Sequence, residues 1–180
     1  IMVGEIRDKE TASIAVNSAM TGHLVLSTLH TNNAATTLPR LIDMGIEPFL
    51  VASSVNIIIA QRLVRKICPK CSQTYSVKLA EFGELQDIIT QKAKEKTEII
   101  LSRGQGCPLC GHTGYIGRIC IFEILQIEKN IQNLITKQAD SGEIQAMAIK
   151  NGMTTMLEDG ISKMLDGITT LEEILRVIRD

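Results

Sequence analysis

The sequence has no tryptophan, and aromatic residues make up only 3% of its 180 residues. Proteins that bind single-stranded nucleic acid stack bases on aromatic rings, so this composition disfavours that class. The formal net charge is only −1, so no strong field draws the chain to nucleic acid or anionic lipid. Hydrophobic residues at 44% and charged residues at 22% are typical of a soluble globular protein.

Long apolar runs are also missing. The longest, residues 49–60, is interrupted by Ser53, Ser54 and Asn56 and is shorter than the roughly 18 to 20 residues that span a bilayer. We therefore expect no transmembrane segment, and no secretory signal is visible. The first residues, Ile1–Gly4, are typical of the middle of a strand, so we expect a fragment of a longer protein.

Residues 1–67 predict the order strand, helix, strand, helix, helix. The first helix begins at Asp8–Thr11 with acidic residues at the positive end of its dipole. Residues 24–29 form a short apolar run without helical period, which suits a strand buried on both faces of a parallel sheet. Pro39 should delay or kink the second helix. The third should begin near Pro48 and end in cations at positions 62, 65 and 66.

The rest of the chain differs in character. Residues 68–125 hold two Cys-x-x-Cys pairs, a polar stretch from Ser76 to Lys96 that we predict to be helical, and a strand at 119–125. Residues 126–180 predict three or four short amphipathic helices. The last one has a capping box, Thr170 with Glu173.

The spacing of the cysteines is the most specific signal. Two pairs, Cys68/Cys71 and Cys107/Cys110, each present two thiolates to one ion. Without an export signal, metal is favoured over disulfides, and the alternatives are redox dithiols or free buried thiols. We predict one structural Zn²⁺ per chain, because four thiolates leave no open position for a substrate.

Two further residues near the cysteine pairs are weaker ligand candidates. Cys120 lies on the following strand, where a small core residue is the simpler interpretation. His112 is close to the second pair, but a turn histidine is the simpler interpretation while four cysteines are available.

The first apolar segment delivers a carboxylate, Glu5, at its end, with Arg7 and Asp8 following at once. Ligands bind at the carboxyl ends of strands in open α/β sheets. A glutamate there can polarise an attacking water or hold a water on Mg²⁺, although a surface salt-bridge cluster is an equal alternative. His23 and His30 stand at the two ends of the next strand, and His30 should emerge at the same edge as Glu5.

Together these segments resemble the type II secretion and type IV pilus assembly ATPases. Residues 2–12 resemble the Walker B segment of that family, and residues 21–33 resemble its His box. Shorter matches follow at residues 45–50, 60–63 with Cys68, 114–118, 122–123 and 159–173.

The resemblance implies an α/β fold: the C-terminal part of a RecA-like P-loop ATPase core, a Cys₄ zinc-binding subdomain and a small helical module. The corresponding domains are residues 1–67, 68–125 and 126–180. It also implies a homohexamer at the cytoplasmic face of the inner membrane. ATP hydrolysis with Mg²⁺ there drives an inner-membrane platform protein, with a cytoplasmic adaptor as a further partner and no nucleic acid.

Roles follow by position. Glu5 is the Walker B glutamate, acting on water or Mg²⁺, and Gly4 stands where many P-loop proteins have their Mg²⁺-binding aspartate. His30 is expected to sense the nucleotide, and Arg7 to orient Glu5 or serve a subunit interface. Gly4, Glu5 and His23 form the expected nucleotide-binding set, although a structural role remains the simpler interpretation of His23.

One departure limits these roles. No G-x-x-x-x-G-K-[ST] motif occurs in the sequence, so the backbone amides and the lysine that cradle phosphates are missing. We therefore expect no appreciable ATPase activity from this chain alone. The alternatives are a non-catalytic zinc-dependent scaffolding module, a zinc-ribbon nucleic-acid binder, which the near-neutral charge disfavours, and a related retraction motor.

Overall fold

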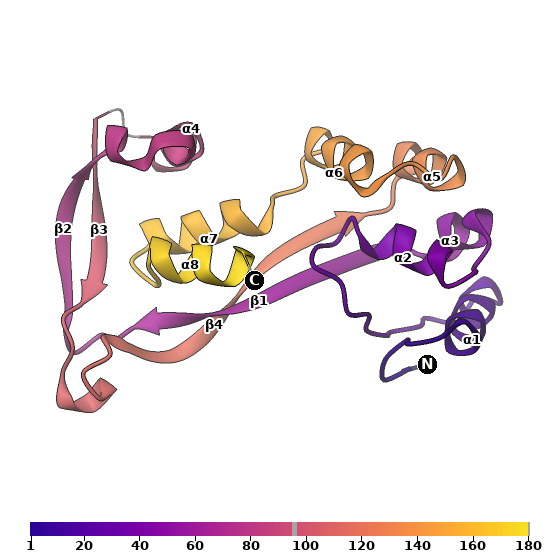
Figure 1. The fold of residues 1–180 in the computed structure, drawn as a ribbon, viewed down its shortest axis with the longest axis horizontal. Helices are drawn as coiled ribbons and strands as arrows, with labels where there is room; N and C mark the ends of the chain where they lie inside the picture. The colour runs from indigo at the N-terminus through magenta and orange to yellow at the C-terminus, as the bar shows by residue number, and fades with distance from the viewer. Residues whose placement is uncertain (95–96, 180) are drawn as a thin grey trace. The chain divides into compact units, whose positions relative to one another are not determined.

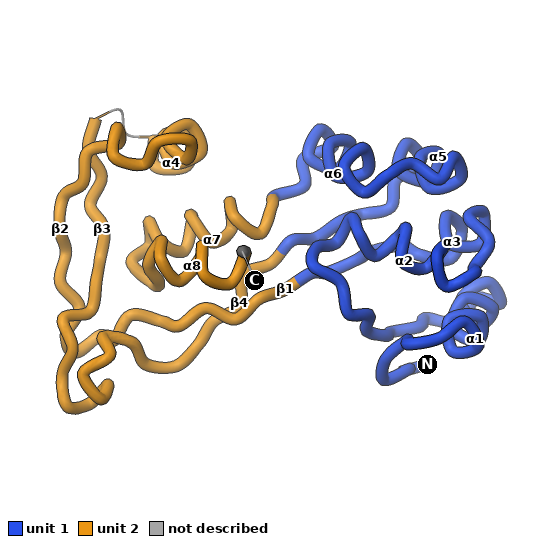
Figure 2. Tube along the Cα trace, in the orientation of Figure 1, with its two compact units in different colours: residues 1–60, 123–154 blue, residues 61–122, 155–180 orange. Residues whose placement is uncertain are grey.

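The computed structural model describes residues 1–94 and 97–179. The chain forms two compact units, each assembled from two stretches of sequence, and Figure 2 shows them in blue and orange. Unit 1 contains residues 1–60 and 123–154, and unit 2 contains residues 61–122 and 155–180. The three domains expected from the sequence, with boundaries after residues 67 and 125, were drawn by motif and stay a prediction.

Unit 1 begins with two extended segments that pair in parallel. The Val3 N–H donates to the Leu26 carbonyl at 2.9 Å, and the Ile6 N–H donates to the Thr28 carbonyl at 2.9 Å. The two segments run parallel, as expected for strands of a parallel sheet, but they form only an isolated bridge between Met2 and Leu26. The prediction of a strand buried on both faces is wrong, since Leu26 is 56% exposed. The pair is covered on one side only: Ile6 is 8% exposed, and Val3, Val25 and Leu29 pack against the core of unit 1.

The first helix agrees with its sequence signals. Helix α1, Lys9–Met20, begins after Asp8, whose side chain accepts a hydrogen bond from the Thr11 N–H at 2.8 Å. Its inward face is made of small residues, and Ala12 is fully buried. The helix stops before Gly22, which has φ +93°, a conformation that only glycine adopts without strain.

The second helix begins late, as Pro39 predicted: α2 covers Thr37–Asp43. The third prediction is wrong in its extent. Helix α3, Pro48–Ser54, ends early, and the following residues form strand β1, Ile57–Ile67, which pairs with β4, Tyr115–Gln126. Three consecutive isoleucines open β1, and β-branched residues favour a pleated strand over a helix when a partner strand is present.

Two helices from the second stretch complete unit 1 (Figure 1): α5, Lys129–Thr136, and α6, Ser141–Lys150. Helix α3 packs against α1 and α5. Fully buried side chains from α2, α5 and α6 contribute to one hydrophobic core, in particular those of Leu38, Ile131, Ile135 and Ile144.

Unit 2 contains an antiparallel hairpin between the cysteine pairs (Figure 1). Strand β2, Ser72–Lys78, pairs with β3, Glu98–Gly104, in a register that sets Ser72 opposite Gly104 and Lys78 opposite Glu98. The 3₁₀ helix η1, Leu79–Leu85, and helix α4, Gln86–Ala93, lie between the strands. The prediction of a helix from Ser76 is wrong for its first three residues, and positions 95–96 at its end lie outside the described residues.

Helices α7, Met156–Leu165, and α8, Leu171–Arg179, complete unit 2 and pack on each other. With α5 and α6 they confirm the predicted short helices. Their close approach requires a glycine, because a Cβ on Gly160 would lie 2.8 Å from Cγ2 of Ile174. The predicted capping box of α8 is half formed: the Glu173 N–H donates to Thr170 Oγ1 at 3.4 Å, while the Glu173 carboxylate binds arginines instead.

Candidate functional site

Glu5 lies between two basic side chains. Its carboxylate accepts a bidentate pair of hydrogen bonds from Arg7, at 2.5 Å from Nε and 2.8 Å from Nη2. On the same carboxylate, Oε2 lies 3.1 Å from Nε2 of His30. The structure therefore brings together the three residues for which catalytic roles are predicted, although His30 is 25 positions away in the sequence.

The parallel pairing of the two extended segments places these side chains. The Ile6 N–H bonds the Thr28 carbonyl, and the Thr28 hydroxyl donates to the Gly4 carbonyl at 2.8 Å. The first segment is thus fixed to the second on both sides of Glu5. Because both segments run in the same direction, the residues that follow them, including His30, emerge at one edge.

The cluster is open to solvent on its basic side. The Arg7 and His30 side chains are 74% and 86% exposed, whereas Glu5 is 30% exposed. The Arg7 hydrogen bonds hold the pKa of Glu5 below its ordinary value, with a smaller contribution from His30. The same contact raises the pKa of Arg7. Glu5 is therefore an ionised carboxylate near neutral pH, with lone pairs to spare for a water or a cation.

The structure places His23 apart from this cluster. Its Nδ1 lies 3.1 Å from the Thr21 hydroxyl and 3.3 Å from the Ser18 carbonyl, both at the end of α1. These contacts are those of a structural histidine, and the place of His23 in a nucleotide site stays a prediction. The place of Gly4 in a nucleotide site also stays a prediction. Its carbonyl accepts a hydrogen bond from the Thr28 hydroxyl, and a Cβ added to Gly4 would meet nothing within 4 Å.

The second candidate site is in unit 2, where the four predicted cysteines converge. The Sγ atoms of Cys68, Cys71, Cys107 and Cys110 all lie within 4.8 Å of one another. The separations are 3.9 Å for Cys68–Cys107, 3.9 Å for Cys71–Cys110 and 3.7 Å for Cys107–Cys110. Four sulfurs around a tetrahedral Zn²⁺ at about 2.3 Å would be about 3.8 Å apart. The donor set and its spacing therefore fit a metal ion.

Backbone amides support the sulfurs. The N–H groups of Cys107 and Gly114 donate to Cys110 Sγ at 3.2 and 3.3 Å. Burial raises the pKa of the Cys110 thiol, but these N–H groups together with the Cys107 and Cys71 side chains outweigh that effect and bring the pKa down to about 6. Burial raises the pKa of Cys71 to about 11. Cys110 thus supplies a thiolate readily, which is the form that binds metal.

The turns around this site leave little room. Gly104 and Gly114 face each other so closely that a Cβ on either would overlap the backbone of the other. The Gly114 carbonyl also accepts from the Cys68 N–H at 2.9 Å, so this contact ties the second cysteine turn to the first. Cys120, on β4, and His112, in a turn with φ +61°, are not among the grouped ligands, as predicted.

Comparison with known proteins identifies the family of this chain. The sequence profile of the family described as "Type II/IV secretion system protein" matches residues 1–176. The chain belongs to the type II/IV secretion system protein family. The resemblance proposed from the Glu5, His30 and cysteine motifs is thereby confirmed.

Two curated members of the family show how much is shared. The chain is 48% identical to the type II secretion system ATPase E of Vibrio cholerae over 182 residues, covering 100% of this chain and 34% of that protein. It is 45% identical to the type IV pilus assembly ATPase PilB of Myxococcus xanthus, covering 97% of this chain and 30% of that protein. The chain thus spans about a third of the length of these relatives.

Solved structures support the α/β fold. The pilus retraction motor PilT with bound ADP matches with a TM-score of 0.64 at 26% identity, over 100% of this chain and 39% of that chain. The ATPase DotB of Legionella pneumophila matches with a TM-score of 0.61 at 22% identity, over 99% of this chain and 38% of that chain. At 22% identity, the similarity to DotB shows a shared fold and nothing about function. Among the described residues of this family member, none belongs to a helix that is both long and apolar enough to cross a membrane.

One buried residue escaped a functional prediction from the sequence. Glu123 on β4 is 3% exposed, and its carboxylate accepts a hydrogen bond from the Ala34 N–H at 2.9 Å. The signal available in the sequence was a carboxylate at an inward position of an apolar strand, but its partner is 89 positions away.

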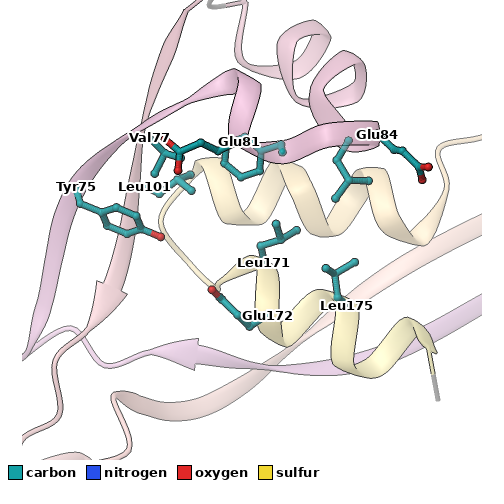
Figure 3. A pocket seen from close by; sticks show the side chains of 10 residues that line it. Tyr75, Val77, Glu81, Glu84, Leu101, Leu171, Glu172 and Leu175 are labelled. Atoms are coloured by element: carbon teal, nitrogen blue, oxygen red, sulfur yellow. The ribbon is translucent and has the colours of Figure 1, made fainter.

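A groove in unit 2 also had no sequence signal. Figure 3 shows it between β2, η1 and α8, with a volume of about 530 Å³. Its lining combines apolar side chains, such as Leu101 and Leu175, with the carboxylates of Glu81, Glu84 and Glu172. Its lining includes no cysteine, histidine or lysine, so we assign it no part in the chemistry of either site.

Proposed function

We propose that the full-length protein containing this chain is an ATP hydrolase that powers assembly of a type II secretion pseudopilus or a type IV pilus. The observation that carries the proposal is the Glu5 carboxylate held between Arg7 and His30. The 48% identity to a type II secretion ATPase over the whole chain supports it. Because the chain spans about a third of such relatives, the activity belongs to the longer protein.

Glu5 is the proposed Walker B glutamate. A carboxylate with a lowered pKa is a weak proton acceptor near neutral pH, so its proposed role is to orient the attacking water or to hold a water on Mg²⁺. Oε2 of Glu5 contacts both Arg7 and His30, whereas Oε1 accepts from Arg7 Nη2 and keeps a second lone pair for this purpose. Arg7 thereby fixes the direction in which the Glu5 oxygens point, and it can serve a subunit interface with its exposed side.

His30 is the proposed sensor of the nucleotide. Its ring is 86% exposed while one nitrogen stays within 3.1 Å of Glu5. A group that arrives at the edge can therefore bond the other ring nitrogen and act on the Glu5 contact through the ring. Nucleotide contact by Gly4 and His23 remains part of the proposal, with less support than for His30.

The four cysteines are proposed to hold one structural Zn²⁺ per chain. A closed Cys₄ set stabilises the fold of the segment that carries it and leaves no position for substrate. The proposed organisation is a RecA-like core segment at 1–67, a zinc subdomain at 68–125 and a helical module at 126–180.

The proposed working form is a homohexamer, cytoplasmic and peripheral at the inner membrane. Its proposed partners are a membrane platform protein and a cytoplasmic adaptor, with no nucleic acid. A phosphate-cradling P-loop must come from residues beyond the 180 of this sequence, which contains no such motif. We therefore propose that the chain alone does not turn over ATP.

The test is ATP turnover by the full-length protein carrying Glu5→Gln. Glutamine keeps the size of the side chain and removes its charge, so hydrolysis should fall by about 10²-fold or more while ATP still binds. Glu10→Gln, at an exposed position of α1, is the matched control and should retain wild-type turnover. Unchanged hydrolysis in Glu5→Gln would remove Glu5 from the mechanism.

A non-catalytic scaffolding module is the second candidate, and the cysteine cluster is the observation that favours it. The two candidates differ in one result. A protein extended upstream through a P-loop hydrolyses ATP if it is a motor and does not if the zinc site serves only to present a binding surface.

A further inference from the structure

Strand β4 carries a carboxylate, Glu123, at a position where the alternation of buried and exposed residues places a side chain in the core. Alternate residues of this strand point inward, and Ile121, Glu123 and Leu125 are 0%, 3% and 1% exposed. Burying a carboxylate costs free energy unless a hydrogen-bond donor compensates it. An apolar residue at position 123 would avoid that cost, so the carboxylate requires an explanation.

One donor to this carboxylate is a backbone amide from a distant part of unit 1. The Ala34 N–H donates to Glu123 Oε1 at 2.9 Å, and Ala34 itself is fully buried. Hydrogen bonds to a charged acceptor are stronger than those between neutral groups, particularly away from water. The contact therefore fixes the position of the backbone at Ala34.

Ala34 lies four residues after His30, in the middle of the turn that leads into α2. Within that turn Asn33 Oδ1 accepts from the Thr36 N–H at 2.9 Å, and the hydroxyls of Thr31 and Thr37 lie 2.9 Å apart. These bonds make the turn from Thr31 to Thr37 one compact unit. Glu123 on β4 bonds this turn through the Ala34 N–H.

The other end of the His30 segment is fixed as well, since the Thr28 carbonyl accepts from the Ile6 N–H at 2.9 Å. The backbone is thus hydrogen-bonded on both sides of His30: at Thr28 to the first segment, and at Ala34 to Glu123. The ring itself is 86% exposed, so side-chain packing cannot fix its place. The backbone on both sides must do so.

We propose that Glu123 is a positioning residue for the Glu5–His30 pair: through Ala34 it holds the turn that sets His30 within hydrogen-bond distance of Glu5. Only the predicted effect of Glu123 on ATP turnover rests on the proposed function. The positioning itself is a property of this chain and is measured without nucleotide.

The first experiment is nuclear magnetic resonance on the 180-residue chain. Glu123→Leu removes the acceptor but keeps an inward side chain of similar size. We expect the Ala34 amide to exchange with solvent at least about fivefold faster, and the His30 ring resonances to move toward random-coil positions. Glu123→Gln keeps an acceptor oxygen but loses the charge, so it should change both readouts less than Glu123→Leu does.

The matched control is Leu125→Ala, which creates a cavity two residues along the same strand without touching the acceptor. It should lower stability while the His30 resonances stay in place. If Leu125→Ala and Glu123→Leu shift His30 equally, Glu123 is only a part of the core and the proposal is overturned.

A further variant keeps the test decisive if Glu123→Leu does not fold. Glu123→Asp retains the charge but withdraws the carboxylate by one methylene, so it should speed Ala34 exchange more than Glu123→Gln does. Equal or slower exchange in Glu123→Asp contradicts the proposal.

Turnover by the full-length protein is the second readout. Glu123→Leu should lower kcat at least about tenfold with KM within about twofold of wild type, because binding groups elsewhere are untouched. Glu123→Gln should restore most of the rate. If the His30 resonances shift and turnover does not fall, Glu123 positions His30 but His30 has no catalytic role. If turnover falls and the His30 resonances do not shift, Glu123 does not position His30.

Discussion

The Glu173 carboxylate accepts two hydrogen bonds from Arg65, which is 108 positions earlier in the sequence: one from the backbone N–H at 3.2 Å and one from Nη2 at 2.5 Å. Arg176 adds two more at 3.0 Å each. Glu173 is 2% exposed, and these donors, Arg65 first, bring its pKa down to about 2. The pair joins β1 to α8 within unit 2.

We therefore predict that unit 2 loses stability on acidification through this one group. A carboxylate whose pKa is lower in the folded state stabilises the fold above its unfolded pKa, near 4.5, and this contribution disappears as the pH falls toward 2. The shift corresponds to about 3 kcal/mol. Glu173→Gln should remove this pH dependence, while Glu172→Gln, at an exposed position, should preserve it.

The measurement of this first prediction can be confined to unit 2. The sequence has two tyrosines, Tyr75 and Tyr115, and no tryptophan, and both tyrosines lie in unit 2. Urea unfolding followed by tyrosine fluorescence at several pH values therefore reports the stability of this unit. A Glu173→Gln variant with the pH profile of the wild type would contradict the assignment.

The cysteine cluster predicts about one zinc per chain by metal analysis. Cys68→Ser should lose the metal and unfold the hairpin region, because the ion contributes folding free energy. Cys120→Ser is the control and should keep the metal, since Cys120 is outside the cluster. A chain that stays folded and metal-free in chelator would show that the four thiols do not need an ion.

Replacing Gly160 tests the packing of α7 on α8. Alanine favours a helix by about 1 kcal/mol over glycine, but its Cβ would lie 2.8 Å from Ile174. Overpacking of this kind costs about 1 to 3 kcal/mol, so Gly160→Ala should destabilise unit 2 overall. Ser162→Ala, on the same helix, serves as the control and should change stability by less than about 1 kcal/mol. A stabilised Gly160→Ala would mean that the two helices are less closely packed than described.

The contact between Arg7 and Glu5 predicts a titration effect. Arg7 is the main cause of the lowered pKa of Glu5, so Arg7→Gln should raise that pKa toward its ordinary value. Lys9→Gln removes a nearby exposed cation that does not bond Glu5 and should leave the pKa unchanged. Carbon-detected titration of the Glu5 carboxyl measures both variants. A Glu5 pKa that does not respond to Arg7→Gln would contradict the observed pairing.

Some features were predictable because their signals are local. The two Cys-x-x-Cys turns each place their own pair of sulfurs, and two long-range backbone hydrogen bonds, Cys68 to Gly114 and Gln105 to Cys71, bring the two turns together. The start of α1 at Asp8 and the delay of α2 by Pro39 likewise depend on neighbouring residues.

Other features depend on partners far along the chain. The cations at positions 62, 65 and 66 predict the end of a helix, but pairing with β4 makes residues 57–67 a strand. The capping box at Thr170 was half right because Arg65 binds the Glu173 carboxylate. Glu123 could not be assigned because its donor is on Ala34. Sequence spacing does not reveal such contacts.

We propose that Glu5 and His30 act as a unit on a nucleotide held by the full-length protein. The most direct test is a double-mutant cycle of ATP turnover with Glu5→Gln, His30→Gln and both together. Since residues that act as a unit are not additive, the double variant should be no slower than Glu5→Gln alone. Independent effects that multiply, or full activity in either single variant, would contradict the account.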